Sequence, residues 1–392
     1  MTPEALAALL SAQGWTLLQA LPPYDERHAL RVSQRLHDEG IDPALVAAVL
    51  TQSRLRAKAR AKFGDFADGM LFTPTGLEQA TRLTVAAHHA QRFRAARFTS
   101  VADLTCGIGA DTMAFAGVGL CVQAAEIDEA TAAIATVNLR HFPEVMVLHT
   151  DGLTLDLTET DAVWADPGRR RRSGSRVFNP ASFSPPLDQV LALREIKPLG
   201  IKLGPGLAHS AIPRDARAQW VSVDGDVVEV GLWFGPLAPE GPGRGALVLT
   251  GDEAHVVTAG PDGPPKAATG PVGGYLYEPD GAVIRAGLVG QVAADLRGRL
   301  VDPTIAYVTS DHRASSPVAT GFRVVDNLPF GVKTLRTYLR QRGVGRLEVK
   351  KRGTAVTPQA LRAQLGLRGP AAATVVLTRV AGAQRVLVVE RL

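Results

Sequence analysis

VADLTCGIGADT, residues 101–112, is the segment that decides the fold of this chain. An apolar run that ends in an acid, Asp103, predicts a buried strand, and Gly107 and Gly109 predict a tight turn into a helix. Glycines at such a turn let a ligand approach the backbone where side chains would obstruct it. A dinucleotide fingerprint would need a third glycine where Thr112 stands, so the turn is not typical of pyrophosphate binding.

Strand and helix patterns alternate from this segment onward, which predicts parallel βαβ units with helices on both faces of one sheet. The expected strands are Val101 to Leu104, Cys121 to Ile127, Val145 to His149, Ala162 to Ala165 and Gly200 to Leu203. The expected helices are Ala110 to Gly117, Glu129 to Leu139, and one that begins after Ser184 as its N-cap. Asp224-Gly225, between two apolar runs, predicts a hairpin as an antiparallel edge. The fold class is therefore α/β, with a mostly parallel, Rossmann-like sheet.

The pattern changes along the chain and predicts four domains. They are a helical N-terminal domain at 1–97, the α/β domain at 98–240, a linker and α+β connecting region at 241–317, and a small α+β domain at 318–392. Residues 236–245 and 260–274 are rich in Gly and Pro and predict loops, and Ala282 to Leu296 predicts a single helix.

Composition excludes several classes of protein. Of the residues, 46% are hydrophobic, but no run approaches the about 20 apolar residues of a membrane span, and the first residues do not read as a secretory signal. Cys106 and Cys121 have neither metal-ligand nor disulfide-framework spacing, which is typical of a reducing cytoplasm and predicts no metal. The 43 Lys and Arg against 38 Asp and Glu leave a net charge of only +5, which alone does not indicate nucleic acid.

Two further acids follow the next strands of the predicted sheet. Glu126 ends the second strand, roughly 20 residues after the glycine turn, where a carboxylate can accept both hydroxyls of a ribose. Asp151 follows the third strand and is placed to accept a hydrogen bond from an adenine amino group. With Asp103, these acids make the sequence resemble the class I S-adenosylmethionine-dependent methyltransferases.

The fourth strand ends in Asp166-Pro167-Gly168-Arg169, where the carboxyl edge of an open α/β sheet faces its ligand. A carboxylate at that place can orient an acceptor or take its proton. The segment resembles the Asp/Asn-Pro-Pro-aromatic motif of nucleic-acid amino-methyltransferases, and the Asp-Pro-Pro-Arg form of some RNA methyltransferases. It departs from both at Gly168 and lacks an aromatic residue that would stack a flipped base. A ring nitrogen, a hydroxyl or a non-nucleic acceptor stays open.

Basic residues gather in two places. Arg169, Arg170, Arg171 and Arg172 follow the acid, with phosphate as their natural partner or solvent as the alternative. Residues 331–369 carry ten Lys and Arg, including Lys350, Lys351 and Arg352, against one acid, which favours a polyanion surface. Lys202, His209 and Arg214 could line an active-site rim, although we interpret them as ordinary strand-end residues.

The combination is similar to one bacterial family, in which a helical N-terminal region, a class I methyltransferase domain and a C-terminal THUMP-like domain are joined. The resemblance is carried by Gly76 to Thr81, Asp103 to Asp111, Asp166 to Arg170, Tyr277-Glu278-Pro279-Asp280, and Gly345 to Gly353. Family members more usually have alanine where Gly168 stands. True THUMP domains bind tRNA, so by analogy the resemblance implies a cytoplasmic methyltransferase whose partner is RNA, either tRNA or rRNA.

The resemblance also implies roles for individual residues. The methyl donor S-adenosylmethionine is expected at Gln79, Asp103, Thr105, Gly107, Gly109, Asp111, Glu126, Ile127, Asp151 and Gly152, with Thr81 a weaker candidate. Catalysis is expected at Asp166, Pro167, Arg169 and Arg170, and RNA binding at Arg171, Arg172, Lys350, Lys351 and Arg352. Two alternatives are a noncatalytic RNA-binding or assembly factor that keeps a nucleoside pocket, and a small-molecule methyltransferase.

Overall fold

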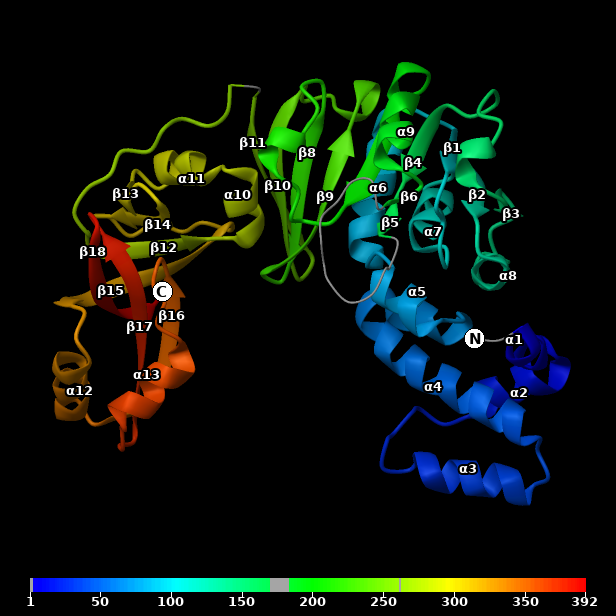
Figure 1. Cartoon of the computed structure of the whole chain (residues 1–392), viewed down its shortest axis with the longest axis horizontal. Helices are drawn as coiled ribbons and strands as arrows, with labels where there is room; N and C mark the ends of the chain where they lie inside the picture. Colours follow the sequence, from blue (N-terminus) through cyan, green and yellow to red (C-terminus); the bar gives the residue numbers. More distant parts are fainter. Residues whose placement is uncertain (1–2, 170–182, 261) are drawn as a thin grey trace. The chain divides into compact units, whose positions relative to one another are not determined.

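The computed structural model describes residues 3–169, 183–260 and 262–392, and the chain divides into two compact units. The first unit contains Met1–Leu203 and Trp233–Pro239. The second contains Gly204–Leu232 and Glu240–Leu392. Figure 1 labels the helices and strands in chain order.

The first unit combines N-terminal helices with a parallel sheet. Its helices are α1 (Pro3–Leu10), α2 (Ala12–Ala20), α3 (Ala29–Asp38), α4 (Pro43–Phe63), α5 (Pro74–Gln79), α6 (Leu83–Ala95), α7 (Ala110–Gly117), α8 (Glu129–Asn138) and α9 (Leu187–Ala192). Its strands are β1 (Ser100–Asp103), β2 (Cys121–Glu126), β3 (Val145–His149), β4 (Ala162–Ala165), the short β5 (Gly168–Arg169) and β6 (Phe183–Ser184), and β7 (Leu199–Leu203).

The five longer strands of this unit are parallel and lie in the order β7-β4-β1-β2-β3. The chain moves outward from β1 to β3 and then returns to β4 on the other side of β1. Because parallel crossovers are right-handed, α7 and α8 cover one face of the sheet and α9 the other. The predicted Rossmann-like fold is confirmed, and its order reverses between β1 and β4, which is where such sheets bind ligands.

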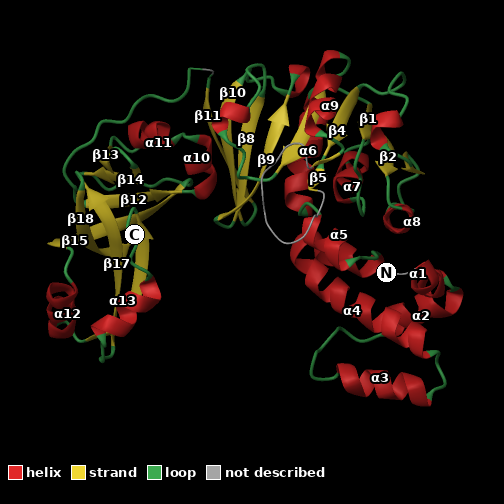
Figure 2. Ribbon diagram, viewed as in Figure 1, coloured by secondary structure: helices red, strands yellow, loops and turns green. Residues whose placement is uncertain are grey.

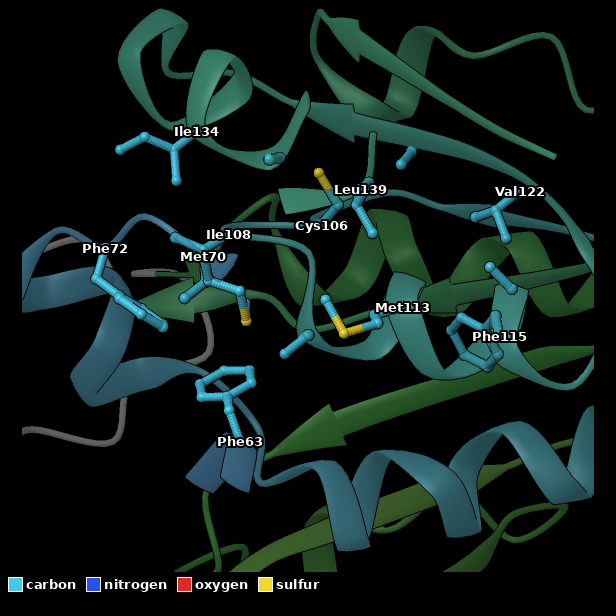
Figure 3. Packing of buried hydrophobic residues seen from close by; sticks show 14 of the residues in the cluster. Phe63, Met70, Phe72, Cys106, Ile108, Met113, Phe115, Val122, Ile134 and Leu139 are labelled. Carbon is cyan, nitrogen blue, oxygen red and sulfur yellow. The ribbon is translucent and has the colours of Figure 1, made fainter. Parts of the chain in front are cut away.

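The N-terminal helices and the sheet share one hydrophobic core. Buried side chains of α4 and of the segment after it, among them Phe63, Met70 and Phe72, pack in the same cluster as Ile108 of the glycine turn. Figure 3 shows side chains from both regions in this cluster. The side-chain amide of Asn138 binds the backbone of Leu71 and the carbonyl of Ile108. The helical region is thus fixed directly against the turn.

The second unit begins with strands β8 (Arg217–Val223) and β9 (Asp226–Trp233). The last residue of β9, Trp233, is counted with the first unit. Asp224 and Gly225 between them have φ of 50° and 88°, so the predicted hairpin is confirmed. It is not an edge, because β10 (Gly243–Thr250) pairs with β8 and β11 (Glu253–Ala259) pairs with β10.

A seven-stranded sheet forms the rest of the second unit, in the order β13-β14-β12-β15-β18-β17-β16. Its strands are β12 (Tyr275–Pro279), β13 (Arg299–Asp302), β14 (Ile305–Ser310), β15 (Ala319–Pro329), β16 (Val344–Arg352), β17 (Ala371–Val380) and β18 (Ala383–Arg391). Its helices are α10 (Gly281–Ala286), α11 (Val289–Asp295), α12 (Val332–Gln341) and α13 (Pro358–Leu365). Leucines of α12 and α13 pack in one cluster with β16, β17 and β18, so both helices cover the same face (Figure 2).

Three further local expectations were wrong. The helix expected over Ala282 to Leu296 is two helices, because Gly287 has φ of 71° and ends the first. Helix α9 has Pro186 at its N-cap with no side-chain cap, and Ser184 instead pairs with Gly168 between β5 and β6. The loop expected at 236–245 ends earlier, because strand β10 begins at Gly243. Hydrogen bonding to β8 and β11 stabilises this strand although its first residues are rich in glycine.

Candidate active site

The glycine turn after β1 has the backbone that its sequence predicts. Gly107 and Gly109 have φ of 56° and 92°, in the left-handed region that glycine favours. A Cβ on Gly109 would lie 2.9 Å from Cδ1 of Leu139, whereas a Cβ on Gly107 would have no atom within 4 Å. Gly109 is therefore required for packing against α8, and Gly107 leaves open space beside the backbone.

Asp103 holds the glycine turn in place through hydrogen bonds. Its carboxylate accepts hydrogen bonds from the Thr112 hydroxyl at 2.6 Å and from the Thr105 backbone N–H at 3.2 Å. The side chain is buried, with 1% of the residue exposed. Burial raises the pKa of Asp103 to about 7, the hydroxyl of Thr112 opposes the shift and the charge of Asp111 adds to it.

Glu126 lies at the end of β2 beside the turn. One carboxylate oxygen accepts the Gly107 backbone N–H at 3.1 Å and the other accepts that of Asp128 at 2.9 Å. Burial raises the pKa of Glu126, and the backbone hydrogen bond from Asp128 opposes the shift. A carboxylate has about four lone-pair positions, so each oxygen keeps capacity for one further donor. Two neighbouring hydroxyls are a matching ligand.

Three more predicted donor-binding residues follow β2 and β3. Ile127 directly follows β2 and is 62% exposed. The Asp151 carboxylate accepts the backbone N–H of Leu153 and begins a short 3-10 turn, Gly152–Thr154. A Cβ on Gly152 would lie 2.1 Å from the carbonyl oxygen of Leu104, so only glycine lets this turn approach β1.

Asp166 lies directly beyond β4, next to the glycine turn. Its backbone N–H donates to the Thr105 hydroxyl at 2.6 Å, and a carboxylate oxygen lies 2.5 Å from Nζ of Lys202 at the end of β7. Pro167 is buried behind it. Lys202, which the sequence led us to interpret as an ordinary strand-end residue, is therefore part of the site.

A buried polar chain runs on from Lys202. Its Nζ donates to the hydroxyl of Thr81 at 2.8 Å, and that hydroxyl donates to Asp111 at 2.6 Å. The other oxygen of Asp111 lies 2.8 Å from Nδ1 of His89. Burial alone would raise the pKa of Asp111, but His89 and the charge of Lys202 lower it. Both carboxylate oxygens of Asp111, an expected donor-binding residue, are thus engaged inside the protein.

The segment between α5 and α6 is held by a second lysine. Nζ of Lys62 donates to the carbonyls of Leu77, Glu78 and Ala80 at 2.7–2.8 Å. Burial, together with the positive charge of Lys202, lowers the pKa of Lys62 to about 8. Gln79, the expected donor-binding residue of this segment, is exposed at the end of α5.

Aromatic side chains pack against His89, at the end of this polar chain. The rings of Trp164 and Trp233 are stacked with centroids 5.5 Å apart, and His89 lies 4.6 Å from the ring of Trp164. Both tryptophans are at most 1% exposed. The sequence offered no signal for His89 or for this packing, because a single histidine on a helix is most often an ordinary core residue.

The arginines expected at the site are only partly described. Gly168 and Arg169 form β5, which pairs with β6, and a Cβ on Gly168 would meet nothing closer than 4.0 Å. Arg170, Arg171 and Arg172 lie outside the described residues. Alanine would therefore fit at Gly168 without any change of backbone.

The basic residues expected to bind RNA in the second unit lie on β16 but differ in their partners. Nζ of Lys350 is 2.9 Å and Nη2 of Arg352 is 3.2 Å from the carboxylate of Glu278 on β12. Burial would raise the pKa of Glu278, but the hydrogen bonds from Lys350 and Arg352 lower it. Lys351, which lies between them on the strand, is exposed. The structure thus joins two sequence motifs, at Tyr277 to Asp280 and at Gly345 to Gly353.

The first unit has features that fit the adenosyl part of S-adenosylmethionine. The open space at Gly107, the spare acceptor capacity of Glu126 and the exposed face of Ile127 fit a glycine-lined nucleoside site. Within the ranges the structure describes, no three His, Cys, Asp or Glu side chains are grouped so that they could hold a metal ion. None of the helices in the described part of the chain has the length and apolar character that crossing a bilayer requires.

Known proteins match most of the chain. Residues 319–391 match the family model described as THUMP domain-like, and residues 2–59 match a domain of unknown function (DUF8688). Sequences from two strains of Mycobacterium tuberculosis, CDC 1551 / Oshkosh and ATCC 25618 / H37Rv, are each 33% identical over 334 residues, covering 83% of this chain and 90% of theirs. Both are described as uncharacterized S-adenosylmethionine-dependent methyltransferases.

The fold also has a counterpart among solved structures. A crystal structure of a candidate methyltransferase from Porphyromonas gingivalis W83 gives a TM-score of 0.70 at 22% identity, over 94% of this chain and 99% of that one. At this level of identity, the likeness concerns the fold alone.

Proposed function

The chain belongs to the S-adenosylmethionine-dependent methyltransferases with a C-terminal THUMP-like domain, and from this premise we propose that it methylates structured RNA, either tRNA or rRNA. The expected cofactor, S-adenosylmethionine, and the expected enzyme class, a methyltransferase, are confirmed. When bound, this cofactor supplies a methyl group that its sulfonium makes electrophilic.

Residues of the glycine turn and its neighbours are proposed to hold the donor. Glu126 accepts the ribose hydroxyls with the lone pairs that Gly107 and Asp128 leave free. Ile127 covers one face of the adenine, and Asp151 accepts from its amino group. Asp103 and Thr105 shape the turn from within, and Gln79 lies on the segment that Lys62 holds. Asp111 contributes by fixing Thr81 and His89.

Asp166 is proposed to orient the acceptor and to take its proton. The residue lies at the carboxyl end of β4, at the reversal of strand order, and the Thr105 hydroxyl fixes its backbone. A positioned general base contributes a factor of about 10² to 10⁴ in rate. Pro167 restricts the backbone behind it, and Arg169 to Arg172 are proposed to bind acceptor phosphates.

Charge on the C-terminal domain supports RNA as the acceptor. Of the ten Lys and Arg in residues 331–369, seven are exposed: Lys333, Arg340, Arg342, Arg346, Lys351, Arg362 and Arg368. They lie on β16, on α12 and α13, and in the adjoining loops. A surface with this excess of one sign attracts a polyanion. Lys351 is the proposed phosphate contact, while Lys350 and Arg352 support it through Glu278.

Transfer of a labelled methyl group tests the acceptor class. The purified protein is incubated with labelled S-adenosylmethionine and, in parallel, with total RNA or with the small-molecule extract of cells that lack the gene. Label in the RNA fraction is expected, and it should decrease as salt rises because phosphate contacts are screened. Label in the metabolite fraction alone would instead identify a small-molecule methyltransferase.

A further inference from the structure

The Asp166 carboxylate does not stand alone at the end of β4. Nζ of Lys202 lies 2.5 Å from one of its oxygens, and the ammonium group is itself largely buried, with 10% of the side chain exposed. The Asp166 side chain is 32% exposed, so the carboxylate borders the site while the lysine lies behind it. Any acceptor that meets Asp166 also meets the field of this ammonium group.

We propose that the acceptor atom is a hydroxyl oxygen, in RNA a ribose 2′-hydroxyl, and that Lys202 is the positioning residue that sets this preference. The inference rests on the proposed function and adds the chemical group that is methylated. It requires that the acceptor gain negative charge, rather than positive charge, as the reaction proceeds.

The reason is the negative charge that a hydroxyl oxygen gains during methyl transfer. The hydroxyl oxygen forms a bond to the methyl carbon while the carbon–sulfur bond breaks and its electron pair stays on sulfur, which leaves a neutral thioether. The hydroxyl proton passes to the Asp166 carboxylate and then to water. As the proton leaves, the acceptor oxygen acquires alkoxide character, which the fixed ammonium group of Lys202 stabilises.

An amino acceptor would be treated differently by the same pair. An exocyclic amine becomes cationic as it accepts a methyl group and must lose its proton afterwards. The buried ammonium group of Lys202, next to Asp166, raises the energy of that cation. It also offsets the negative charge of Asp166, which would otherwise stabilise the cation. The Asp166–Lys202 pair thus favours an oxygen acceptor over an amino group.

The polar chain behind Lys202 explains how the pair keeps its geometry. Thr81 accepts from Lys202 and donates to Asp111, which His89 binds from the other side. A buried network whose members all have partners holds its side chains in one arrangement. Lys202 therefore faces Asp166 before any acceptor arrives, and the field needs no reorganisation during transfer.

The position of the methyl group is the direct test. Labelled RNA from the transfer reaction is digested to nucleosides and analysed by mass spectrometry. Methyl groups on ribose are expected, recognised by loss of a methylated sugar fragment. Methyl groups on a base would overturn this inference and leave RNA methylation standing. No label in RNA from gene-deleted cells would overturn the RNA proposal and this inference together.

Substitution of Lys202 tests its part. Lys202→Met is expected to lower kcat by 100-fold or more with the Kd for S-adenosylmethionine changed less than threefold, and Lys202→Arg should restore most of the rate. Lys58→Met, an exposed lysine on α4, is the matched control. An unchanged kcat in Lys202→Met would overturn the role. If that variant does not fold, Thr81→Val, which removes the hydroxyl that Lys202 binds, should lower kcat by about tenfold, and an unchanged kcat would count equally against it.

Discussion

Nζ of Lys202 and a carboxylate oxygen of Asp166 lie 2.5 Å apart, although the two residues are at the ends of different strands. Strands β4 and β7 are parallel neighbours, with Ala165 paired to Ile201, so their carboxyl ends place both side chains at the same edge. We propose that this pair combines a proton acceptor with a fixed positive charge beside the glycine turn, and that it promotes transfer by position and electrostatics.

Asp166→Asn tests the proposed base. The amide keeps the size of the side chain but cannot take a proton, so kcat should fall by about 10² or more. The free energy of donor binding should change by less than about 1 kcal/mol, because a group that acts mainly in the transition state contributes little to donor binding. Steady-state kinetics and donor titration measure the two effects. Full turnover in the variant would remove Asp166 from the mechanism.

The sequence predicted the strands and acids of this site but not its lysine network. Asp103, Glu126 and Asp166 end predicted strands, and the parallel pattern places such ends together. Thr81 and His89 come from the helical region before β1, and only the tertiary fold brings them to Lys202. No spacing in the sequence connects residues so far apart, which is why Lys202 was interpreted as an ordinary strand-end residue.

The two turn glycines should respond differently to substitution. Gly109→Ala adds a Cβ that clashes with Leu139 at a positive φ, and should lower the free energy of unfolding by about 1–3 kcal/mol. Gly107→Ala fills open space and should cost about 1 kcal/mol of backbone strain, while it weakens donor binding at least tenfold. Chemical denaturation and calorimetry separate the two. Equal donor affinity in Gly107→Ala and the wild type would contradict the proposed approach of the donor.

Asp103 should make stability depend on pH. The folded protein holds this proton up to about pH 7, whereas an unperturbed aspartate releases it near 3.8. Folding therefore binds a proton between these values, so the contribution of Asp103 to stability is present at low pH and is lost as pH rises from about 4 to about 7. Asp103→Asn lacks this titration and serves as the reference.

The measurement is thermal or denaturant unfolding of the wild type and Asp103→Asn at a series of pH values from 4 to 8. The stability of the wild type relative to the variant should fall through this range and level off above about pH 7. A constant difference between the two proteins would show that the pKa of Asp103 is not raised in the folded state.

Glu278 should stabilise the seven-stranded sheet of the second unit. Glu278→Gln leaves Lys350 and Arg352 without their anion in a half-buried position, and should lower the free energy of unfolding by about 1–3 kcal/mol. Because the pKa of Glu278 is lowered, this contribution is present above about pH 4.5 and is lost as pH falls further. Glu348→Gln, exposed on β16, is the control. Equal stability of the two variants would contradict the role of the pair.

The C-terminal domain was predicted in outline but not in full. The apolar periodicity of the sequence also predicts a helix over Pro358 to Leu365 and strands over Ile305 to Thr309, Arg346 to Lys350 and Thr374 to Thr378. Helix α13 and strands β14, β16 and β17 lie at these places. In the second unit as a whole, strands β10, β11, β12, β13 and β18 were not predicted. Strand β10 begins in a glycine-rich stretch and β13 has only four residues, so each is defined by its neighbours in the sheet, which a local pattern cannot show.

Calorimetric titration with the methyl donor tests whether the glycine turn and Glu126 form its binding site. Titration of the wild type with S-adenosylmethionine should produce heat, and S-adenosylhomocysteine should compete. Glu126→Gln should lose affinity by tenfold or more, whereas Glu129→Gln, at an exposed neighbouring position, should bind as the wild type does. If the wild type gives no heat at millimolar donor, or if Glu126→Gln binds as tightly as the wild type, the site is not where the glycine turn and Glu126 place it.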